Sequence, residues 1–320
     1  MVPIMKKKIL YIQAIHPAGM DLLRNKYNVV VANNEAKSFL LNAVADTDAI
    51  VTRLTEIDKD IIEAGKCLKA IAKNGIGVDN IDVQAATENG IAVLTTGAAN
   101  TGSVAEAVIF AMGAMYKKTV YFDRAMHNKN WKCRDEGGFY DVAGRTFGIV
   151  GLGRIGGQVA QIAKAFHMKV LVCDAVISRE QIETMGYTCA ESMEELCRKA
   201  DVISLHMPLT EENTRIINEH TLSLMKPTAY VINFSRGAMV DEDALYQALV
   251  HKKIAGAALD AFAPEPPDFT HPLYGLDRVL LSPHTAGISE DARKQMSLQI
   301  ARGIDDVLSG KIPECCVNRI

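Results

Sequence analysis

The stretch GIVGLGRIGGQ, residues 148–158, joins two different kinds of sequence. It begins inside TFGIVG (146–151), a run typical of a buried strand, and a segment with helical periodicity starts near Arg154. Glycines spaced as G-x-G-x-x-G also occur in ordinary tight turns, so the spacing alone is weak evidence. Strand, glycines and helix together predict the first crossover of an open α/β sheet.

Three glycines of this crossover would have different physical tasks. Gly151 permits the tight turn, Gly153 lets a pyrophosphate approach the backbone, and Gly156 lets the helix pack closely against the strand. The first helical residues, Arg154 and Ile155, lie where N–H groups and a partial positive charge face a phosphate. We therefore predict a dinucleotide-binding turn, with a turn that serves only packing as the alternative.

An acidic residue ends the next predicted strand, KVLVCD (169–174). Asp174 lies 18 residues after Gly156, close to the spacing of about 20 expected for a carboxylate that binds the ribose hydroxyls of a dinucleotide. Its charge would repel a 2′-phosphate, and Ala175 and Val176 supply no basic partner. The predicted cofactor is therefore NAD rather than NADP.

Short apolar runs alternate with helical segments along the whole chain. The first series of runs covers 8–13, 28–32, 48–52, 68–72 and 91–96, and the second covers 146–151, 169–174, 201–206, 229–234, 254–260 and 278–284. This alternation predicts parallel sheets with helices on both faces. The predicted fold class is α/β, with two doubly wound parallel-sheet domains.

Two segments outside this alternation affect the domain layout. Ser103 and Glu106 have the spacing of a capping box and precede a strongly apolar helix, which we expect to be buried at a domain junction or a subunit contact. The helix-like stretch 289–309 has no strand after it, and its return to the first domain would make that domain discontinuous. Trp131 is expected to be a packing anchor.

Composition bounds the class of protein. With 320 residues, of which 48% are hydrophobic and 23% charged, the chain is typical of a soluble protein with two domains. A net charge of −3 and the absence of long like-charge runs predict no nucleic-acid partner. No uninterrupted stretch approaches the ~18 apolar residues that span a bilayer, so no membrane partner is expected.

The cysteines and the start of the chain bear on localisation. The seven cysteines are scattered and contain no C-x-x-C pair, which favours reduced thiols in a cytoplasmic protein without a metal site. The start MKKKILYIQAI imitates a signal peptide, but its apolar run contains Gln13 and lacks a small-residue cleavage site. We expect it to form the first strand instead.

Chemistry-bearing residues follow the last three predicted strands. Arg236 follows strand 229–234, Glu265 follows 254–260, and His284 follows the strand part of the last run, 278–282. Ligands of open α/β sheets lie at the carboxyl ends of the strands, so these side chains should converge. Reduction of a 2-keto acid requires these types: a guanidinium for the carboxylate, an imidazolium as proton donor, and a carboxylate that orients the imidazolium.

The chain resembles the D-isomer-specific 2-hydroxyacid dehydrogenase family over essentially its whole length, closest in pattern to phosphoglycerate dehydrogenase-type members. The matching segments are VTRLTEIDKDII, GIGVDNIDVQAATENGI, SVAE, VGLGRIGGQVA, HMPLT, INFSRGAMVDEDAL, GAALDAFAPEPP and LLSPHTAG. The resemblance implies an NAD-dependent oxidoreductase that interconverts a D-2-hydroxy acid and its 2-keto acid, of the phosphoglycerate, glycerate/hydroxypyruvate or glyoxylate type.

The resemblance also implies roles for single residues. Arg236, Glu265 and His284 would be the catalytic set, with His284 as acid and base and Glu265 as its partner. Asp260 would hold the nicotinamide carboxamide. The remaining implied contacts are Pro208 and Thr214 on the adenine and ribose side, and backbone amides of Gly75, Ile76, Gly77 and Val78 at the substrate carboxylate.

Arg53 and two departures from the family pattern concern the substrate side. Arg53 would face the far end of the substrate, where a phosphate contact and a plain sheet-edge charge are both open. Lys73 stands where many members have arginine, and a bidentate contact at that place would be lost. Gly97 replaces a common proline. The chain ends at Ile320, so we do not expect the C-terminal regulatory domains of longer members.

The family layout implies a flavodoxin-like substrate-binding domain, residues 1–99 with 288–320, and a Rossmann NAD-binding domain, residues 100–287. Homodimers through the NAD-binding domain are usual in the family. A second functional class stays open, because dinucleotide-sensing corepressor-like proteins share the fold and the catalytic set. The absence of extended disordered tails disfavours that class.

Overall fold

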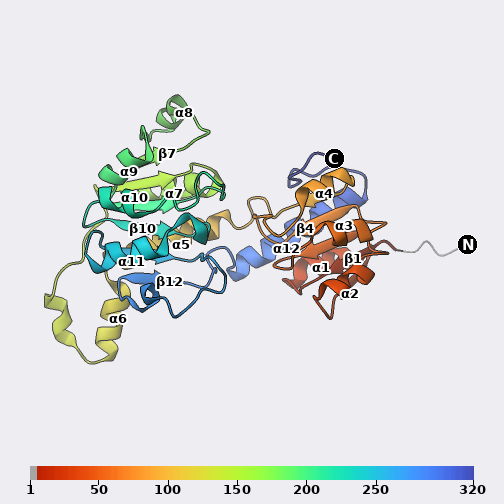
Figure 1. The fold of residues 1–320 in the computed structure, drawn as a ribbon, viewed down its shortest axis with the longest axis horizontal. Coiled ribbons are helices and arrows are strands. Elements are labelled where there is room, and N and C mark those ends of the chain that lie inside the picture. Colours follow the sequence, from red (N-terminus) through yellow and green to blue (C-terminus); the bar gives the residue numbers. More distant parts are fainter. Residues whose placement is uncertain (1–5) are drawn as a thin grey trace, which may run out of the picture. The chain divides into compact units, whose positions relative to one another are not determined.

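The computed structural model describes residues 6–320, which form two compact units. One unit contains the chain up to Asn100 together with Ile288–Ile320, and the other is Thr101–Gly287. Each unit is built on one parallel sheet with helices on both of its faces (Figure 1). This architecture confirms the predicted α/β class with two doubly wound domains.

The first unit contains a five-stranded sheet in the order β2-β1-β3-β4-β5. Its strands are β1 (Lys8–Tyr11), β2 (Asn28–Val31), β3 (Ala49–Thr52), β4 (Ala70–Lys73) and β5 (Ala92–Leu94). All neighbouring pairs are parallel, with Ile9 paired to Val29 on one side and Ala49 on the other. This strand order is the flavodoxin-like one.

Helices cover both faces of the five-stranded sheet. They are α1 (Pro17–Arg24) and α12 (Glu290–Leu308) on one face, and α2 (Lys37–Ala43), α3 (Lys59–Ala64) and α4 (Val83–Glu88) on the other. Helices α1 and α12 approach each other closely, since a Cβ at Gly19 would lie 2.2 Å from the Ser297 carbonyl oxygen. The C-terminal helix is therefore an integral layer of this unit.

The second unit contains a seven-stranded sheet in the order β12-β11-β10-β9-β6-β7-β8. Its strands are β6 (Thr146–Val150), β7 (Lys169–Cys173), β8 (Thr188–Cys189), β9 (Val202–Leu205), β10 (Tyr230–Asn233), β11 (Gly256–Leu259) and β12 (Val279–Leu281). The first strand, β6, lies inside the sheet. Strands β7 and β8 are added on one side of β6, and β9 to β12 are added on the other side, as in a Rossmann sheet with one extra strand. The short β8 was not predicted.

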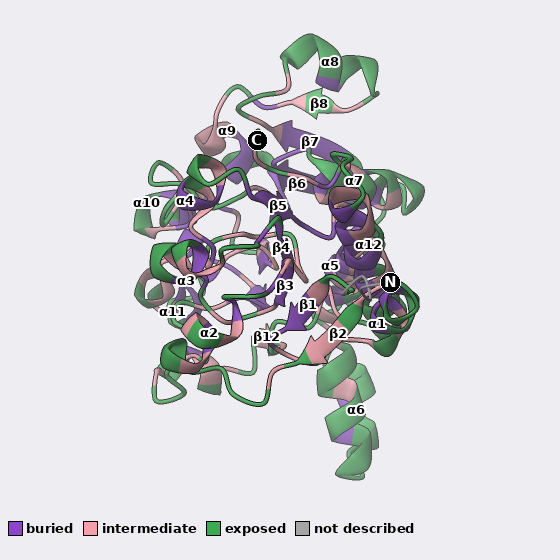
Figure 2. Cartoon of the chain, turned by 90° about the vertical axis from the view of Figure 1, so that its right-hand side faces the viewer, coloured by how far each residue is buried: buried purple, intermediate pink, exposed green. Residues whose placement is uncertain are grey.

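Helices again form two layers around this sheet. They are α5 (Thr101–Tyr116), α7 (Arg154–Ala165) and α8 (Arg179–Thr184) on one face, and α9 (Met193–Lys199), α10 (Glu219–Leu224) and α11 (Glu242–Val250) on the other. Short 3-10 turns lie at Gly237–Met239 and Pro272–Gly275. Helix α6 (Thr119–His127) and the 3-10 turn Trp131–Asp135 extend away from the sheet, and α6 is mostly exposed (Figure 2).

Three local expectations were wrong. Helix α5 begins at Thr101, so Ser103 lies within its first turn and cannot be the residue that caps it. Trp131 is not a packing anchor, because its side chain is 63% exposed. The exposure arises because the 3-10 turn that carries Trp131 projects from the sheet. Strand β12 ends at Leu281 rather than near residue 284, because His284 takes a φ of 52°, which is incompatible with a strand.

The described residues also bear on thiols, metals and membranes. All seven cysteines are free thiols. Between residues 6 and 320, no three His, Cys, Asp or Glu side chains are grouped so that they could hold a metal ion. Over the same residues, no helix combines the length and the apolar character needed to cross a membrane.

Candidate active site

The glycine-rich turn between β6 and α7 has the backbone geometry that its glycines suggest. Gly151 has a φ of 92°, in the region that favours glycine, and its N–H donates to the Cys173 carbonyl at 2.9 Å. A Cβ at Gly156 would lie 2.0 Å from the Gly151 oxygen, so α7 rests directly on the turn. A Cβ at Gly153 would meet nothing within 4 Å. The backbone at Gly153 is therefore open to an approaching group.

The N-terminus of α7 has no cap. Gly153 is the N-cap residue and offers no side chain. The N–H groups of Gly153, Arg154, Ile155 and Gly156 donate to no other residue between 6 and 320. Unpaired N–H groups and the helix dipole together favour an anion at this position. These residues fit a dinucleotide pyrophosphate.

Asp174 joins the glycine-rich turn to the turn that follows β7. Its Oδ2 accepts from the Leu152 N–H at 2.6 Å, and its Oδ1 accepts from the N–H groups of Val176 and Ile177 at 2.8 Å. Partial burial raises the pKa of Asp174, but the three N–H donors outweigh it and hold the pKa below its usual range. The carboxylate is thus ionised at neutral pH.

The segment directly after Asp174, residues 175–178, contains no basic residue that could bind a 2′-phosphate. The nearest arginine along the chain towards the C-terminus, Arg179, lies 3.5 Å from Glu183 and 3.8 Å from Glu191. A 2′-phosphate placed beside Asp174 would therefore face the negative charge of an ionised carboxylate. This geometry agrees with the prediction of NAD rather than NADP.

The loop after β9 carries the residues expected on the adenine side. Pro208 and Thr214 are both exposed, and the loop is braced by its own polar groups. Asn213 Nδ2 donates to the Pro208 carbonyl at 2.7 Å, and Thr214 Oγ1 donates to the Thr210 carbonyl at 2.9 Å. Both residues are thus presented on a braced surface loop.

His206, in the segment HMPLT, lies in the same region, and no role in binding or catalysis was predicted for it. The His206 backbone packs against Gly151, and a Cβ at Gly156 would lie 3.3 Å from the Cβ of His206. Its Nε2 is buried without a hydrogen-bond partner, and desolvation lowers the pKa of His206 to about 3. The imidazole is therefore neutral.

Glu265 and His284 meet at the carboxyl edge of the seven-stranded sheet. Glu265 follows β11 and His284 follows the adjacent β12, so neighbouring strands bring the two loops together. His284 Nδ1 lies 2.8 Å from each carboxylate oxygen of Glu265. The side chains are 49% and 40% exposed, respectively. The two side chains therefore contact each other and are both accessible to a ligand.

Arg236 follows β10, which pairs with β11 on this edge. Its carbonyl accepts from Asn233 Nδ2 at 2.8 Å, and its Nη1 donates to the Ser235 carbonyl at 2.9 Å. A Cβ at Gly237 would lie 2.0 Å from the Phe262 carbonyl carbon, and the Phe262 N–H donates to Glu265 Oε1 at 3.1 Å. The segments that carry Arg236 and Glu265 are therefore in direct backbone contact.

Asp260 braces the turn that contains His284. It is 1% exposed, its Oδ1 accepts from the Thr285 N–H at 2.8 Å, and its Oδ2 accepts from the Ala286 N–H at 2.9 Å. A carboxylate has about four acceptor sites, so this bracing leaves room for the carboxamide contact that the resemblance implies. The turn-holding contact was not predicted.

The residues predicted on the substrate side lie in the other unit, at the carboxyl edge of its sheet. Arg53 follows β3, and among residues 6–320 no hydrogen bond or ion pair is made by its guanidinium. The loop Gly75, Ile76, Gly77, Val78 follows β4, and its four N–H groups donate to no described residue. Consecutive free N–H groups of this kind suit a carboxylate.

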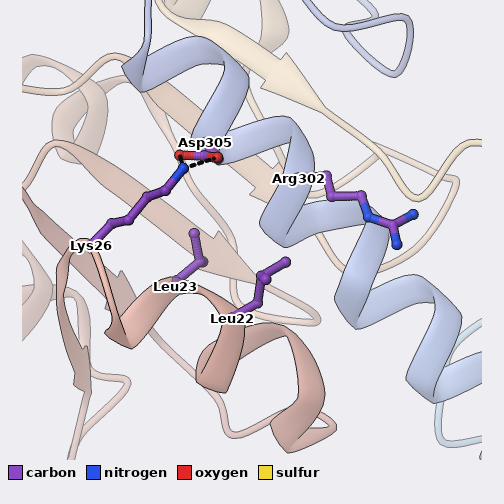
Figure 3. A pocket seen from close by; sticks show the side chains of 5 residues that line it. All are labelled: Leu22, Leu23, Lys26, Arg302 and Asp305. Carbon is purple, nitrogen blue, oxygen red and sulfur yellow. Dashed lines mark hydrogen bonds and ion pairs between the residues drawn. The ribbon is translucent and has the colours of Figure 1, made fainter.

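A pocket of about 230 Å³ lies between α1 and α12 of the same unit (Figure 3). It is lined by Leu22, Leu23, Lys26, Arg302 and Asp305. Its lysine is already paired, since Lys26 Nζ lies 2.7 Å from Asp305 Oδ2. The pocket lies on a helical face of the sheet rather than at the strand ends, and we assign it no ligand.

The fold and the glycine-rich turn define an α/β dinucleotide-binding protein. Residues 109–286 match the model of the D-isomer specific 2-hydroxyacid dehydrogenase, NAD binding domain. The chain belongs to the D-isomer specific 2-hydroxyacid dehydrogenase family, which confirms the resemblance seen in the sequence.

Individual relatives agree over most of this chain. It is 39% identical to a D-3-phosphoglycerate dehydrogenase of Methanocaldococcus jannaschii over 97% of its own length but 59% of that protein. It is 38% identical to a glyoxylate reductase of Korarchaeum cryptofilum, covering 98% of this chain and 97% of the relative. The solved glyoxylate reductase of Paecilomyes thermophila superposes with a TM-score of 0.87 at 29% identity, covering 98% of each chain.

Proposed function

We propose that this protein is an NAD-dependent oxidoreductase that interconverts a D-2-hydroxy acid and its 2-keto acid. The observation that carries the proposal is the His284–Glu265 pair, which lies with Arg236 on the same sheet edge as the dinucleotide-binding turn. Relatives named for phosphoglycerate and for glyoxylate both support a small 2-hydroxy or 2-keto acid as substrate.

The side chains divide the work of keto-acid reduction. Arg236 binds the substrate carboxylate and polarises the keto oxygen. His284 turns Nδ1 towards Glu265, which leaves Nε2 to hold the proton that is delivered to that oxygen. Glu265 orients the imidazolium and stabilises its charge. When bound, NADH supplies the hydride, and the reverse reaction returns the proton to His284.

The remaining predicted residues hold cofactor and substrate. The Gly153–Gly156 N–H groups receive the pyrophosphate, Asp174 receives the ribose, and Pro208 and Thr214 flank the adenine side. The N–H groups of Gly75–Val78 receive the substrate carboxylate. The substrate-binding domain would thus be 1–99 with 288–320, and the NAD-binding domain 100–287.

We further infer a homodimer in the cytoplasm. Large apolar side chains are exposed on α5, on α6 and beyond it, including Phe110 at 73% and Met126 at 50%, and clustered apolar exposure is typical of an interface. Sedimentation should show a dimer that Phe110→Asp weakens, while Phe166→Asp, at a residue 47% exposed elsewhere on the unit, leaves it intact. A Phe110→Asp protein that still sediments as a dimer would contradict this interface.

The cytoplasmic location is supported by the cysteines. Their free thiols agree with a reducing compartment.

The test of the activity is a panel of keto acids with NADH: hydroxypyruvate, glyoxylate, phosphohydroxypyruvate, pyruvate and branched-chain keto acids. We expect loss of NADH absorbance with at least one of them, and a weaker rate with NADPH. Tight NADH binding without turnover of any acid would favour the dinucleotide-sensing alternative.

A further inference from the structure

The turn that carries Arg53 is held by side chains from several strand ends of the five-stranded sheet. We call residues 53–55 the Arg53 turn. The Arg53 N–H donates to Gln13 Oε1 at 2.9 Å, and the Arg53 carbonyl accepts from Lys73 Nζ. The Thr55 carbonyl accepts from Asn80 Nδ2 at 2.7 Å. Both ends of the turn are thus fixed.

A second set of bonds closes this network on the other side. Glu35 Oε2 accepts from Gln13 Nε2 at 2.7 Å and from Thr55 Oγ1 at 2.6 Å. Gln13 Nε2 also donates to Thr55 Oγ1. Fully paired polar networks favour one arrangement of the chain, because breaking a member leaves its partners unsatisfied. The Arg53 turn is therefore held in place by side chains of the protein itself.

Lys73 is the cation of this network. Its Nζ lies 2.5 Å from Asn80 Oδ1, besides its bond to the Arg53 carbonyl. Its stem runs beside the Gly75 backbone, since a Cβ at Gly75 would lie 3.4 Å from the Lys73 Cε. Lys73 thus lies between the Arg53 turn and the N–H groups of Gly75–Val78, with its charge engaged by groups of the protein.

We propose that Lys73 is a positioning residue: through the Arg53 carbonyl and Asn80 it fixes the Arg53 turn, and thereby holds the Arg53 guanidinium in place as a contact for the substrate. This inference rests on the proposed function. Lysine at this position, where many members of the family have arginine, then acts as a brace for the turn that carries Arg53.

The kinetic test is a double-mutant cycle of Lys73→Met and Arg53→Met, assayed with the keto acid of the panel that gives the lowest KM. Each single variant should raise KM by about tenfold with little change in kcat, and the double variant should be no worse than Arg53→Met. Lys73→Arg should restore most of the affinity. The matched control is Lys69→Met, an exposed lysine at the start of the same strand region.

A second measurement needs no turnover. Amide hydrogen exchange of the Arg53 turn should quicken in Lys73→Met and stay unchanged in Arg53→Met and Lys69→Met, because only Lys73→Met removes a bond to the turn. Additive KM effects, or unchanged exchange in Lys73→Met, would overturn the proposal. If exchange is faster in Lys73→Met but the natural protein reduces no keto acid of the panel, the proposed function would be wrong and the bracing role of Lys73 would stand.

Discussion

His284 occupies a backbone conformation that few residues other than glycine adopt. Its φ is 52°, in the left-handed region, which costs on the order of 1 kcal/mol. The cost is offset by the bonds from Thr285 and Ala286 to the buried Asp260. The buried Asp260 thus holds the turn of His284 beside the carboxylate of Glu265.

The first prediction concerns this imidazole. His284→Gln should lower kcat by about 10²-fold, because general acid catalysis contributes at least that much. NADH affinity should stay nearly the same, since the dinucleotide-binding turn is untouched. Steady-state rates and fluorescence titration of NADH measure the two effects. His127→Gln, at a side chain 82% exposed, is the control, and full activity in His284→Gln would show that the proton donor is another group.

The second prediction concerns Asp174 and the preference for NADH over NADPH. Asp174→Asn keeps the shape of the side chain but removes the negative charge of the carboxylate, which three backbone N–H groups hold in its ionised form. We expect NADH affinity to fall by about tenfold, as for a lost charged hydrogen bond, and the disadvantage of NADPH to shrink. Titrations with both cofactors check this, with the exposed Asp21→Asn as control. An unchanged NADH-to-NADPH ratio would contradict the assignment.

At the scale of elements, helix α7 offers two adjacent glycines in opposite situations. A Cβ at Gly156 would lie 2.0 Å from the Gly151 oxygen, whereas a Cβ at Gly157 would meet nothing within 4 Å. Gly156→Ala should therefore displace α7, destabilise the protein by about 2 kcal/mol or more and weaken NADH binding. Gly157→Ala should stabilise it by about 0.5–1 kcal/mol, because alanine favours a helix.

Urea denaturation with and without NADH measures both glycine variants. The comparison is matched, because the two variants add the same methyl group to neighbouring positions of one helix. Equal stability of the two proteins would mean that α7 does not rest on the glycine-rich turn as described.

Strand ends are the elements from which the site could be predicted. The rule that ligands lie beyond the carboxyl ends of parallel strands led from the sequence to Arg236, Glu265 and His284. Applied equally to the first sheet, it would have led to Gln13 after β1 and Lys73 at the end of β4. Their bonds to the Arg53 turn could still not be predicted, because side-chain direction depends on neighbouring strands that are distant in sequence.

At the scale of the whole molecule, burial of the His206 Nε2 atom makes folding sensitive to acid. Its pKa is 6.5 ordinarily and about 3 in the native protein. Between these values the unfolded chain binds a proton that the native protein excludes. Stability from this group is therefore complete above pH 6.5 and lost as pH falls towards about 3, by at most about 1.4 kcal/mol per pH unit.

Urea denaturation at several pH values tests this prediction. The free energy of unfolding of His206→Gln should depend less steeply on pH in this window than that of the natural protein. His127→Gln removes an exposed histidine and should leave the dependence unchanged. Parallel pH profiles for the natural protein and His206→Gln would show that His206 is protonated as easily in the folded protein as in the unfolded one.

The sequence by itself determined the α/β class, the glycine-rich turn and the three chemical groups at the strand ends, because each depends on residues close together in the chain. Only the tertiary structure decided that His284 Nδ1 faces Glu265 and that Asp260 fixes the His284 turn. It also decided that Lys73 turns towards the Arg53 carbonyl. The physical reason is that these contacts form between strands paired across the sheet. Their geometry follows from register and packing, which no local pattern of residues records.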